Sequence, residues 1–302
     1  MYETDSVPED WVRRCNRMKS VWVPTEFHRQ TFLRAGVQAH KLVVVGEPVD
    51  SDFFDPAKVS TPFSLPPPVP SAAAAGASFR FLSVFKWEKR KGWDALLAAY
   101  FAEFKPSDPV ELLLKTRAFH SSDDFDALIS SFVQEHGLPK TSAGRATVRI
   151  LGDDLSLEEL RSLYAAADCF VLPSRGEGWG RPHVEAMSMG LPVIATNWSG
   201  PTAFLDEAVG YPLGYSVEPV APELNLPGHN WAEPSVAHLR QLMRQVYEHR
   251  EEAKERGGAA RQRMVSEYSP DALAKRVVEA VAESKRRISE HRQRKDAIRD
   301  EL

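Results

Sequence analysis

Short apolar runs alternate with amphipathic segments through the middle of the chain. The apolar runs are Phe79–Phe85, Val110–Leu114, Thr147–Leu151, Cys169–Leu172 and Val193–Thr196. The segments between them have apolar residues at helical spacing, and they are Asp94–Phe104, Asp123–Glu135, Ser156–Ala166 and Pro182–Met189. Strands of continuous apolar residues are typical of parallel sheets buried on both faces. The alternation therefore predicts an α/β fold with a doubly wound parallel sheet.

Two short elements of each kind precede this region. Pro8–Lys19 and Glu26–Ala35 have helical spacing, while Val21–Pro24 and Leu42–Val45 are short apolar runs typical of strands. Met1–Ser60 is too short to form a complete α/β domain. We therefore expect it to be the end of a domain whose beginning is missing, together with the segment that crosses to the next domain.

The composition changes on both sides of the predicted sheet. Thr61–Ser78 holds a proline triplet and an alanine run with few large apolar residues, which predicts a flexible linker or insert. From Glu233 onward the pattern is helical, in Val236–His249, Lys254–Tyr268 and Pro270–Arg294. The expected organisation is an N-terminal remnant (1–60), a linker (61–78), the sheet domain (79–232) and C-terminal helices (233–302).

Charge and cysteine content narrow the class of protein. Lys and Arg number 38 against 42 Asp and Glu, a net charge of -4, which argues against nucleic acid as the main partner. Cys15 and Cys169 are the two cysteines, and neither suggests a metal or disulfide framework. The first twenty residues lack the apolar core of a signal peptide, and no apolar run is long enough to span a membrane. These features predict a cytoplasmic protein.

A glycine-rich loop follows the apolar run that ends at Leu172. Gly176, Gly178 and Gly180 allow the backbone to approach a ligand closely, and the helix behind them presents unpaired N–H groups. This arrangement is typical of a phosphate site. Glu177 and Glu185 flank it, and carboxylates suit the hydroxyls of a sugar or ribose. A purely structural role for Glu185 at the helix start is the alternative.

A basic segment follows the first strand of the predicted sheet. Lys86-Trp87-Glu88-Lys89-Arg90-Lys91-Gly92 carries four cations close to the carboxyl end of that strand. Such a run is usually a solvated loop. Since the glycine-rich loop is expected at the same edge of the sheet, Lys86 and Lys91 become candidates for binding an anion there.

Together these two segments resemble the family 4 retaining glycosyltransferases. EGWGRPHVEAMSMGLPVIATNWSG, from Glu177 to Gly200, is similar to the donor-binding signature of that family, including its E-x7-E motif. FLSVFKWEKRKGWDALL, from Phe81 to Leu97, is similar to the segment that holds the donor diphosphate. The resemblance implies a GT-B fold, in which two Rossmann-like domains face each other and the C-terminal one binds the nucleotide-sugar.

The resemblance also implies roles for individual residues. Glu185 would bind the ribose, Glu177 the transferred sugar, and Lys86 and Lys91 the leaving diphosphate. The backbone of Gly178, Trp179 and Gly180 would contact sugar and phosphate, and that of Leu151 and Gly152 the base. Neither a metal nor another cofactor is expected, because the lysines and a helix N-terminus would stabilise the leaving group. For Trp179, packing under the loop is an alternative to binding, and for His183 the alternative is a residue on the helix surface.

The sequence departs from the family in three places. Phe85-Lys86 stands where the family usually has Gly-Arg, so a bidentate phosphate clamp becomes a point charge. Ala203 stands where a glutamate is common. Third, Met1–Ser60 resembles only the end of the family's N-terminal domain, and we expect it to lack the part that carries the acceptor-side residues of the family.

The resulting prediction is a metal-independent enzyme that moves a hexose from a nucleoside diphosphate to an acceptor with retention of configuration. The acceptor, whether glycan, lipid, protein or small molecule, is open, as are the base and the sugar. One alternative is a binding module that holds the nucleotide-sugar without transferring it, unless another domain or a partner chain completes it. The other is an unrelated nucleotide-binding Rossmann enzyme, against which no G-x-G-x-x-G follows the first strand.

Overall fold

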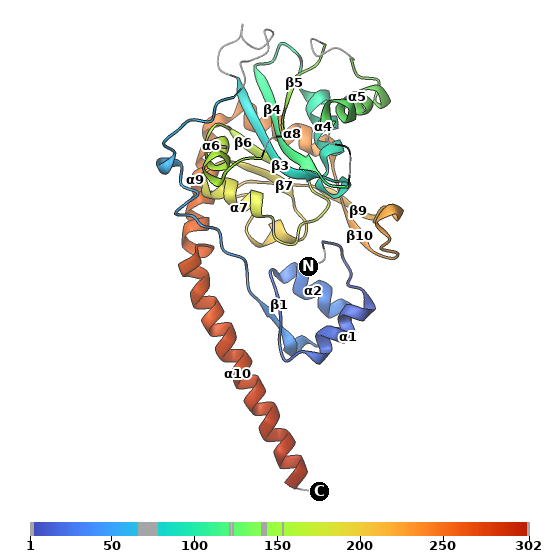
Figure 1. Cartoon of the computed structure of the whole chain (residues 1–302), viewed down its shortest axis with the longest axis vertical. Coiled ribbons are helices and arrows are strands. Elements are labelled where there is room, and N and C mark those ends of the chain that lie inside the picture. The colour runs from blue at the N-terminus through green and yellow to red at the C-terminus, as the bar shows by residue number, and fades with distance from the viewer. Residues whose placement is uncertain are drawn as a thin grey trace.

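A six-stranded parallel sheet forms the centre of the molecule (Figure 1). The computed structural model describes residues 3–65, 78–120, 122, 124–139, 144–152 and 154–300. The strands lie in the order β5-β4-β3-β6-β7-β8, and each pairs with its neighbours in parallel. Their bounds are β3 (Phe79–Trp87), β4 (Val110–Ala118), β5 (Thr147–Leu151), β6 (Cys169–Leu172), β7 (Val193–Thr196) and β8 (Tyr211–Leu213). The predicted α/β class and parallel sheet are confirmed.

The apolar runs form the strands because both faces of the sheet are covered. Every residue of β6 and β7 is buried, as the continuous apolar pattern requires. β3 and β4 are longer than predicted, because they continue to pair beyond their apolar positions, with Lys86 opposite Arg117 and Trp87 opposite Ala118. Lys86 therefore lies within the strand and not in the loop after it. β8 follows a loop of mixed composition and was not predicted.

Helices cover both faces of the sheet (Figure 1). They are α4 (Trp93–Glu103), α5 (Phe125–Glu135), α6 (Leu157–Ala165), α7 (Arg181–Ser188), α8 (Val236–Glu248) and α9 (Arg250–Glu267). α4 packs against α8, and α7 packs against α9. Ser156 and Glu159 form the predicted capping box of α6. α5 begins two residues later than predicted, because Asp124 caps it by accepting a hydrogen bond from Ala127 N–H.

The N-terminal residues form a small separate module. It contains α1 (Glu9–Arg17), β1 (Val21–Val23), α2 (Glu26–Arg34) and β2 (Leu42–Val44), close to the predicted bounds. β1 and β2 pair in parallel as a two-stranded sheet. The module has its own hydrophobic cluster, formed by Val7, Val23, Phe32, Val37 and Leu42.

The region after β8 differs from the sequence prediction. β9 (Tyr215–Pro219) and β10 (Asn230–Pro234) form an antiparallel hairpin. Glu233 therefore lies in a strand, and the predicted helical region begins only at Val236. The reason is that Glu233 pairs with Ser216 across the hairpin, a contact that helical periodicity does not reveal.

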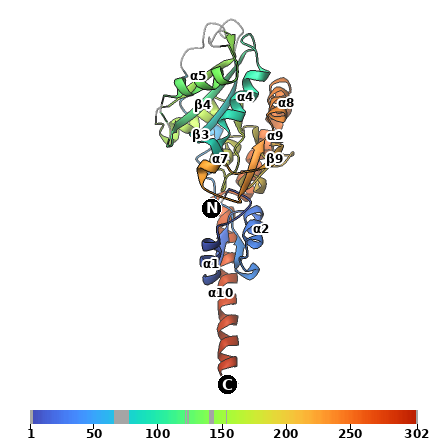
Figure 2. The ribbon, with the colours of Figure 1, turned by 90° about the vertical axis from the view of Figure 1, so that its right-hand side faces the viewer.

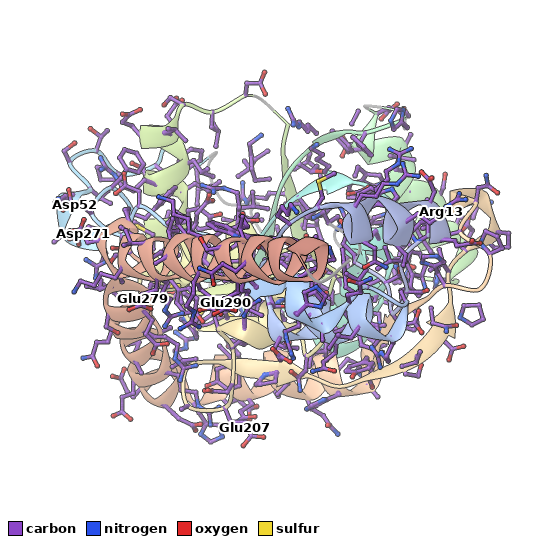
Figure 3. The ribbon with its side chains drawn as sticks, turned by 90° about the horizontal axis from the view of Figure 1, so that it is seen from below. Arg13, Asp52, Glu207, Asp271, Glu279 and Glu290 are labelled. Carbon is purple, nitrogen blue, oxygen red and sulfur yellow. The ribbon has the colours of Figure 1, made fainter. Side chains whose placement is uncertain are left out.

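The last helix, α10 (Pro270–Asp300), extends from the body of the molecule past the N-terminal module (Figures 1 and 2). Its Ser284 hydroxyl contacts the Ser20 hydroxyl at 3.3 Å, and Arg287 donates to the His40 carbonyl. Figure 3 shows this helix from below, with Asp271, Glu279 and Glu290 along its length. Within the described ranges, no helix is both long and apolar enough to cross a lipid bilayer. Most of the predicted linker, residues 66–77, lies outside the described residues.

Candidate functional site

The order of the strands locates the candidate site. β3 lies between β4 and β6, so the chain moves outward from β3 to β5 and then returns to the other side of β3. Ligands of doubly wound sheets bind outside the carboxyl ends of the strands at such a switch point. The loop after β3 and the glycine-rich loop after β6 meet here, where Arg175 N–H donates to the Arg90 carbonyl at 2.6 Å.

A cavity of about 450 Å³ opens at this edge of the sheet. Its walls come from β3, β4 and the segments that follow β3, β4 and β5, with Leu160 from α6 and Pro182 from the first turn of α7. The charged lining residues are five cations and two carboxylates, Lys86, Arg90, Lys91, Lys115, Arg117, Glu88 and Asp154. This excess of positive charge suits an anionic ligand.

Lys91 and Glu177, the two residues predicted to act on phosphate and sugar, form a buried ion pair. Lys91 Nζ lies 2.7 Å from Glu177 Oε1 and 2.8 Å from Oε2. Burial alone would raise the pKa of Glu177, but Lys91 and Arg90 outweigh it and lower this pKa to about 2. An ammonium group has three N–H donors, so the pair leaves one of them for a further acceptor.

Arg90 also belongs to the candidate site, although its sequence pattern did not predict this. Its guanidinium donates to the Gly176 carbonyl at 2.7 Å, to Glu177 at 3.3 Å and to Glu88 at 2.7 Å. It also lies 3.7 Å from the carboxylate of Glu3, which precedes α1 near the start of the chain. Since four of the six residues from Lys86 to Lys91 are basic, their sequence does not show which of them faces the glycine-rich loop.

The glycine-rich loop is held in place from two sides. Glu177 N–H donates to Ser199 Oγ, and Gly200 N–H donates to the Glu177 carbonyl at 2.9 Å. A Cβ on Gly200 would lie 2.4 Å from the Trp179 carbonyl, so only glycine fits there. A Cβ on Gly176 would lie 2.3 Å from the Glu3 carbonyl. Both contacts fix the backbone that carries Glu177.

Glu185 lies on α7, behind the same loop. It is 9% exposed, and the buried Tyr164 hydroxyl donates to its Oε2 at 3.1 Å. Burial raises the pKa of Glu185, while Tyr164 and Arg181 lower it. Tyr164 therefore holds the carboxylate in one orientation in an environment that water hardly reaches.

The other predicted residues differ in their surroundings. Lys86 lines the cavity, with its Nζ 4.8 Å from the ring centroid of Phe119. Trp179 packs inward against Phe204 and Tyr268, as the packing alternative predicted. Gly178 and Gly180 are buried in the loop beside it. Leu151 ends β5 and Gly152 follows it, and neither lines the cavity. The described lining residues of that segment are Asp154 and Leu155.

His183 is fully buried in the first turn of α7. Its ring lies 5.4 Å from Phe170, measured between ring centroids. Burial lowers the pKa of His183 to about 4; Lys91 acts in the same direction and Glu177 opposes it. The ring is therefore neutral at neutral pH and packs inside the fold. The expected position on the helix surface is wrong, because the side chain of His183 points into the core beside Phe170.

A buried arginine, Arg175, supports the loop after β6. Arg175 pairs with Glu233 of β10 at 2.6 Å and with Asp94 of α4 at 2.9 Å. Its guanidinium also donates to the Lys89 carbonyl. These contacts join the glycine-rich loop, the basic loop and the hairpin, although the acidic partners lie 81 and 58 residues away along the chain.

Within the part of the chain that the structure describes, no group of three or more His, Cys, Asp and Glu side chains is placed to hold a metal ion. The residues that can hold a charged ligand are the lysines and arginines of the cavity and the N-terminus of α7.

Residues 78–223 match the model of the family described as glycosyl transferases group 1. A stretch of 53 residues is 51% identical to O-antigen chain mannosyltransferase B of Escherichia coli, and covers 18% of this chain and 13% of that protein. Another of 75 residues is 36% identical to sucrose synthase of Melioribacter roseus, and covers 25% of this chain and 9% of that protein. The matches thus span only a small part of these curated relatives.

Solved structures match much more of the chain. HepE of Anabaena, solved in complex with UDP and glucose, has a TM-score of 0.67 at 18% identity and covers 91% of this chain and 68% of its own. Sucrose-phosphate synthase of Thermosynechococcus elongatus has a TM-score of 0.65 at 21% identity, with 90% and 60% covered. The sheet is the Rossmann-like sheet of GT-B glycosyltransferases. Together, the family match and the fold support a GT-B glycosyltransferase.

Proposed function

We propose that the chain binds a nucleoside diphosphate sugar in the cavity at the β3–β6 switch point and transfers its hexose to an acceptor with retention of configuration. The observation that carries the proposal is the position of Lys91, Glu177 and the α7 N-terminus on one crevice of a glycosyltransferase-like fold. A related fold, that of HepE, has been solved with UDP and glucose.

The proposed mechanism relies on the residues of this crevice. The bond between the anomeric carbon and the diphosphate oxygen breaks, and the oxygen keeps the electron pair. The acceptor hydroxyl attacks the anomeric carbon from the same face and gives its proton to the departing phosphate oxygen. Lys91 can donate its third N–H to the leaving phosphate while it holds Glu177, and Lys86 adds a second positive charge. Glu177 would bind a sugar hydroxyl and Glu185 the ribose. In this proposal the cations and helix N-terminus stabilise the leaving group without a metal.

Calorimetric titration tests this proposal. The purified chain is titrated with uridine, guanosine and adenosine diphosphates and their hexose conjugates, with a chelator present. We expect one diphosphate to bind without metal and Glu185→Ala to weaken that binding at least about tenfold. Arg263→Gln, a change at a surface ion pair with Asp206, is the matched control. Failure of all the nucleotides to bind would reject the proposal.

Turnover distinguishes a transferase from a module that only binds the nucleotide-sugar. Release of free diphosphate from the conjugate that binds is followed with the wild type, Lys91→Ala and Glu177→Ala. Turnover that falls in both variants supports transfer chemistry at this pair. Binding of the conjugate without any release of diphosphate would favour a module that holds the nucleotide-sugar and does not transfer it.

A further inference from the structure

The cavity has two ends, which follow from the strand order. Lys91 and Pro182 lie on the side of β3 and β6, where the glycine-rich loop ends. Lys115, Arg117 and Asp154 lie on the side of β4 and β5, because the first two are in β4 and the third follows β5. If the diphosphate binds at the first end, as proposed above, the second end faces the base.

The long pairing of β3 with β4 determines what the second end presents. Arg117 lies opposite Lys86, and Lys115 lies two residues earlier on the same face of the strand. Phe119 follows β4 and has an exposed ring beside Lys86. The second end therefore presents one aromatic ring, that of Phe119, and two cations, Lys115 and Arg117.

Asp154 is the carboxylate of this end. It is exposed and, among the described residues, it forms no ion pair with a cation. Arg117 likewise has no ion pair within the described ranges. Both side chains are exposed and line the cavity. The described lining residues include neither Asn nor Gln, the amides that pair with adenine through one donor and one acceptor.

The hydrogen-bonding edges of the bases differ in a way that this lining can distinguish. Guanine presents two adjacent donors, N1–H and N2–H, which a single carboxylate can accept together. Its O6 and N7 are acceptors, for which arginine and lysine are the usual partners. Uracil presents one donor between two carbonyl oxygens, and adenine presents one amino group beside ring nitrogens that accept. A carboxylate placed against either would face at least one acceptor.

We infer that the cavity selects guanosine diphosphate donors, with Asp154 accepting from N1–H and N2–H of the base and Arg117 donating to its acceptor side. The inference rests on the proposed function and specifies its donor. Phe119 supplies an aromatic face on which the base can stack. Asp154 is a specificity-determining residue in this view, and has no part in the transfer step.

Calorimetry with guanosine, uridine and adenosine diphosphates tests the selection directly. For the wild type we expect guanosine diphosphate to bind at least about tenfold more tightly than either of the others, the discrimination expected of one bidentate base contact. In Asp154→Ala, guanosine diphosphate should lose about tenfold in affinity while the other two change less than about twofold. Arg117→Ala should weaken guanosine diphosphate in the same selective way.

Glu158→Gln is the matched control, because this exposed carboxylate lies on α6 nearby but does not line the cavity. It should leave all three affinities unchanged. Equal or tighter binding of uridine or adenosine diphosphate by the wild type would overturn the inference and leave the proposed function intact. So would a guanosine preference that survives in Asp154→Ala. Absence of binding by all three would overturn both.

Discussion

Lys91 donates hydrogen bonds to both carboxylate oxygens of Glu177, although 86 residues separate them in the sequence. Their side chains are 11% and 8% exposed, so the pair is largely removed from water. The interaction joins the loop after β3 to the loop after β6 across the switch point. It therefore places the two functional groups on a single crevice before any ligand binds.

Removing one partner of this pair should destabilise the fold. Lys91→Met leaves Glu177 buried with Arg90 as its remaining cation, and we expect a loss of about 3 kcal/mol in the free energy of unfolding. The double variant Lys91→Met with Glu177→Gln should lose less than the sum of the single changes. Urea denaturation measures the free energy of unfolding of Lys91→Met, of Glu177→Gln and of the double variant.

Lys89→Met is the control for that series. Lys89 pairs with Asp94, but its side chain is 55% exposed, and we expect a loss below about 1 kcal/mol. A Lys91→Met variant no less stable than Lys89→Met would contradict the importance given to the buried pair.

His183 should make stability depend on pH in a defined window. Its pKa is about 4 in the folded chain against an ordinary value of 6.5, because burial disfavours the charged ring. Below pH 6.5 the unfolded chain therefore binds a proton that the folded chain does not. The free energy of unfolding consequently falls as the pH drops from 6.5 towards 4, by up to about 3 kcal/mol.

The measurement compares urea denaturation of the wild type and His183→Leu at several pH values in this window. In the variant, the slope of the free energy of unfolding against pH should be smaller by the contribution of about one bound proton. If the free energy of unfolding depends on pH equally in the wild type and in His183→Leu, the imidazole ring is not held neutral in the folded chain.

Two neighbouring glycines of α9 should respond to alanine in opposite directions. A Cβ on Gly257 would lie 2.2 Å from the backbone carbonyl of Gly190, so Gly257→Ala must separate α9 from the end of α7. A Cβ on Gly258 meets no atom within 4 Å. We expect Gly258→Ala to stabilise by about 0.5–1 kcal/mol, since alanine favours a helix, and Gly257→Ala to destabilise by more than about 1 kcal/mol. Thermal unfolding of the two variants checks this, and equal melting temperatures would refute the tight packing of α7 on α9.

Tyr164 should affect donor binding without touching the donor. Tyr164→Phe removes the hydrogen bond to Glu185 and leaves a buried carboxylate without its donor, so the pKa of Glu185 should rise further. We expect about tenfold weaker binding of the nucleoside diphosphate that the wild type prefers. Tyr100→Phe, which removes a buried hydroxyl bonded to the Thr147 carbonyl elsewhere in the sheet, should leave the affinity unchanged in the same calorimetric experiment.

The central elements were predictable because burial on both faces makes a strand continuously apolar. β6 and β7 have the predicted bounds for that reason. β5 also has its predicted bounds, although it lies at the edge of the sheet and its residues are only half-buried. β3 and β4 exceed theirs because backbone pairing between them continues through charged residues such as Lys86. β9 was missed because all five of its residues are exposed, so no apolar pattern marks it.

The candidate site was partly predictable for a topological reason. Loops after neighbouring parallel strands meet at one edge, so Lys91 and Glu177 could be assigned to one crevice from their positions in the sequence. Arg175 could not, because its role depends on Asp94 and Glu233, which are distant in sequence and belong to a helix and a hairpin. Asp154 carries no signature of its own, and only the cavity lining singles it out.

The separate cluster of Val7, Val23, Phe32, Val37 and Leu42 has a consequence for the dynamics of the molecule. Cooperative unfolding requires a shared core, and this module does not share that of the large sheet. Its amides should exchange with solvent through local opening events at lower free energy than those of β6 and β7. Such an opening would leave the Lys91–Glu177 pair intact, because neither residue belongs to the module, and the chain would then unfold as two cooperative units.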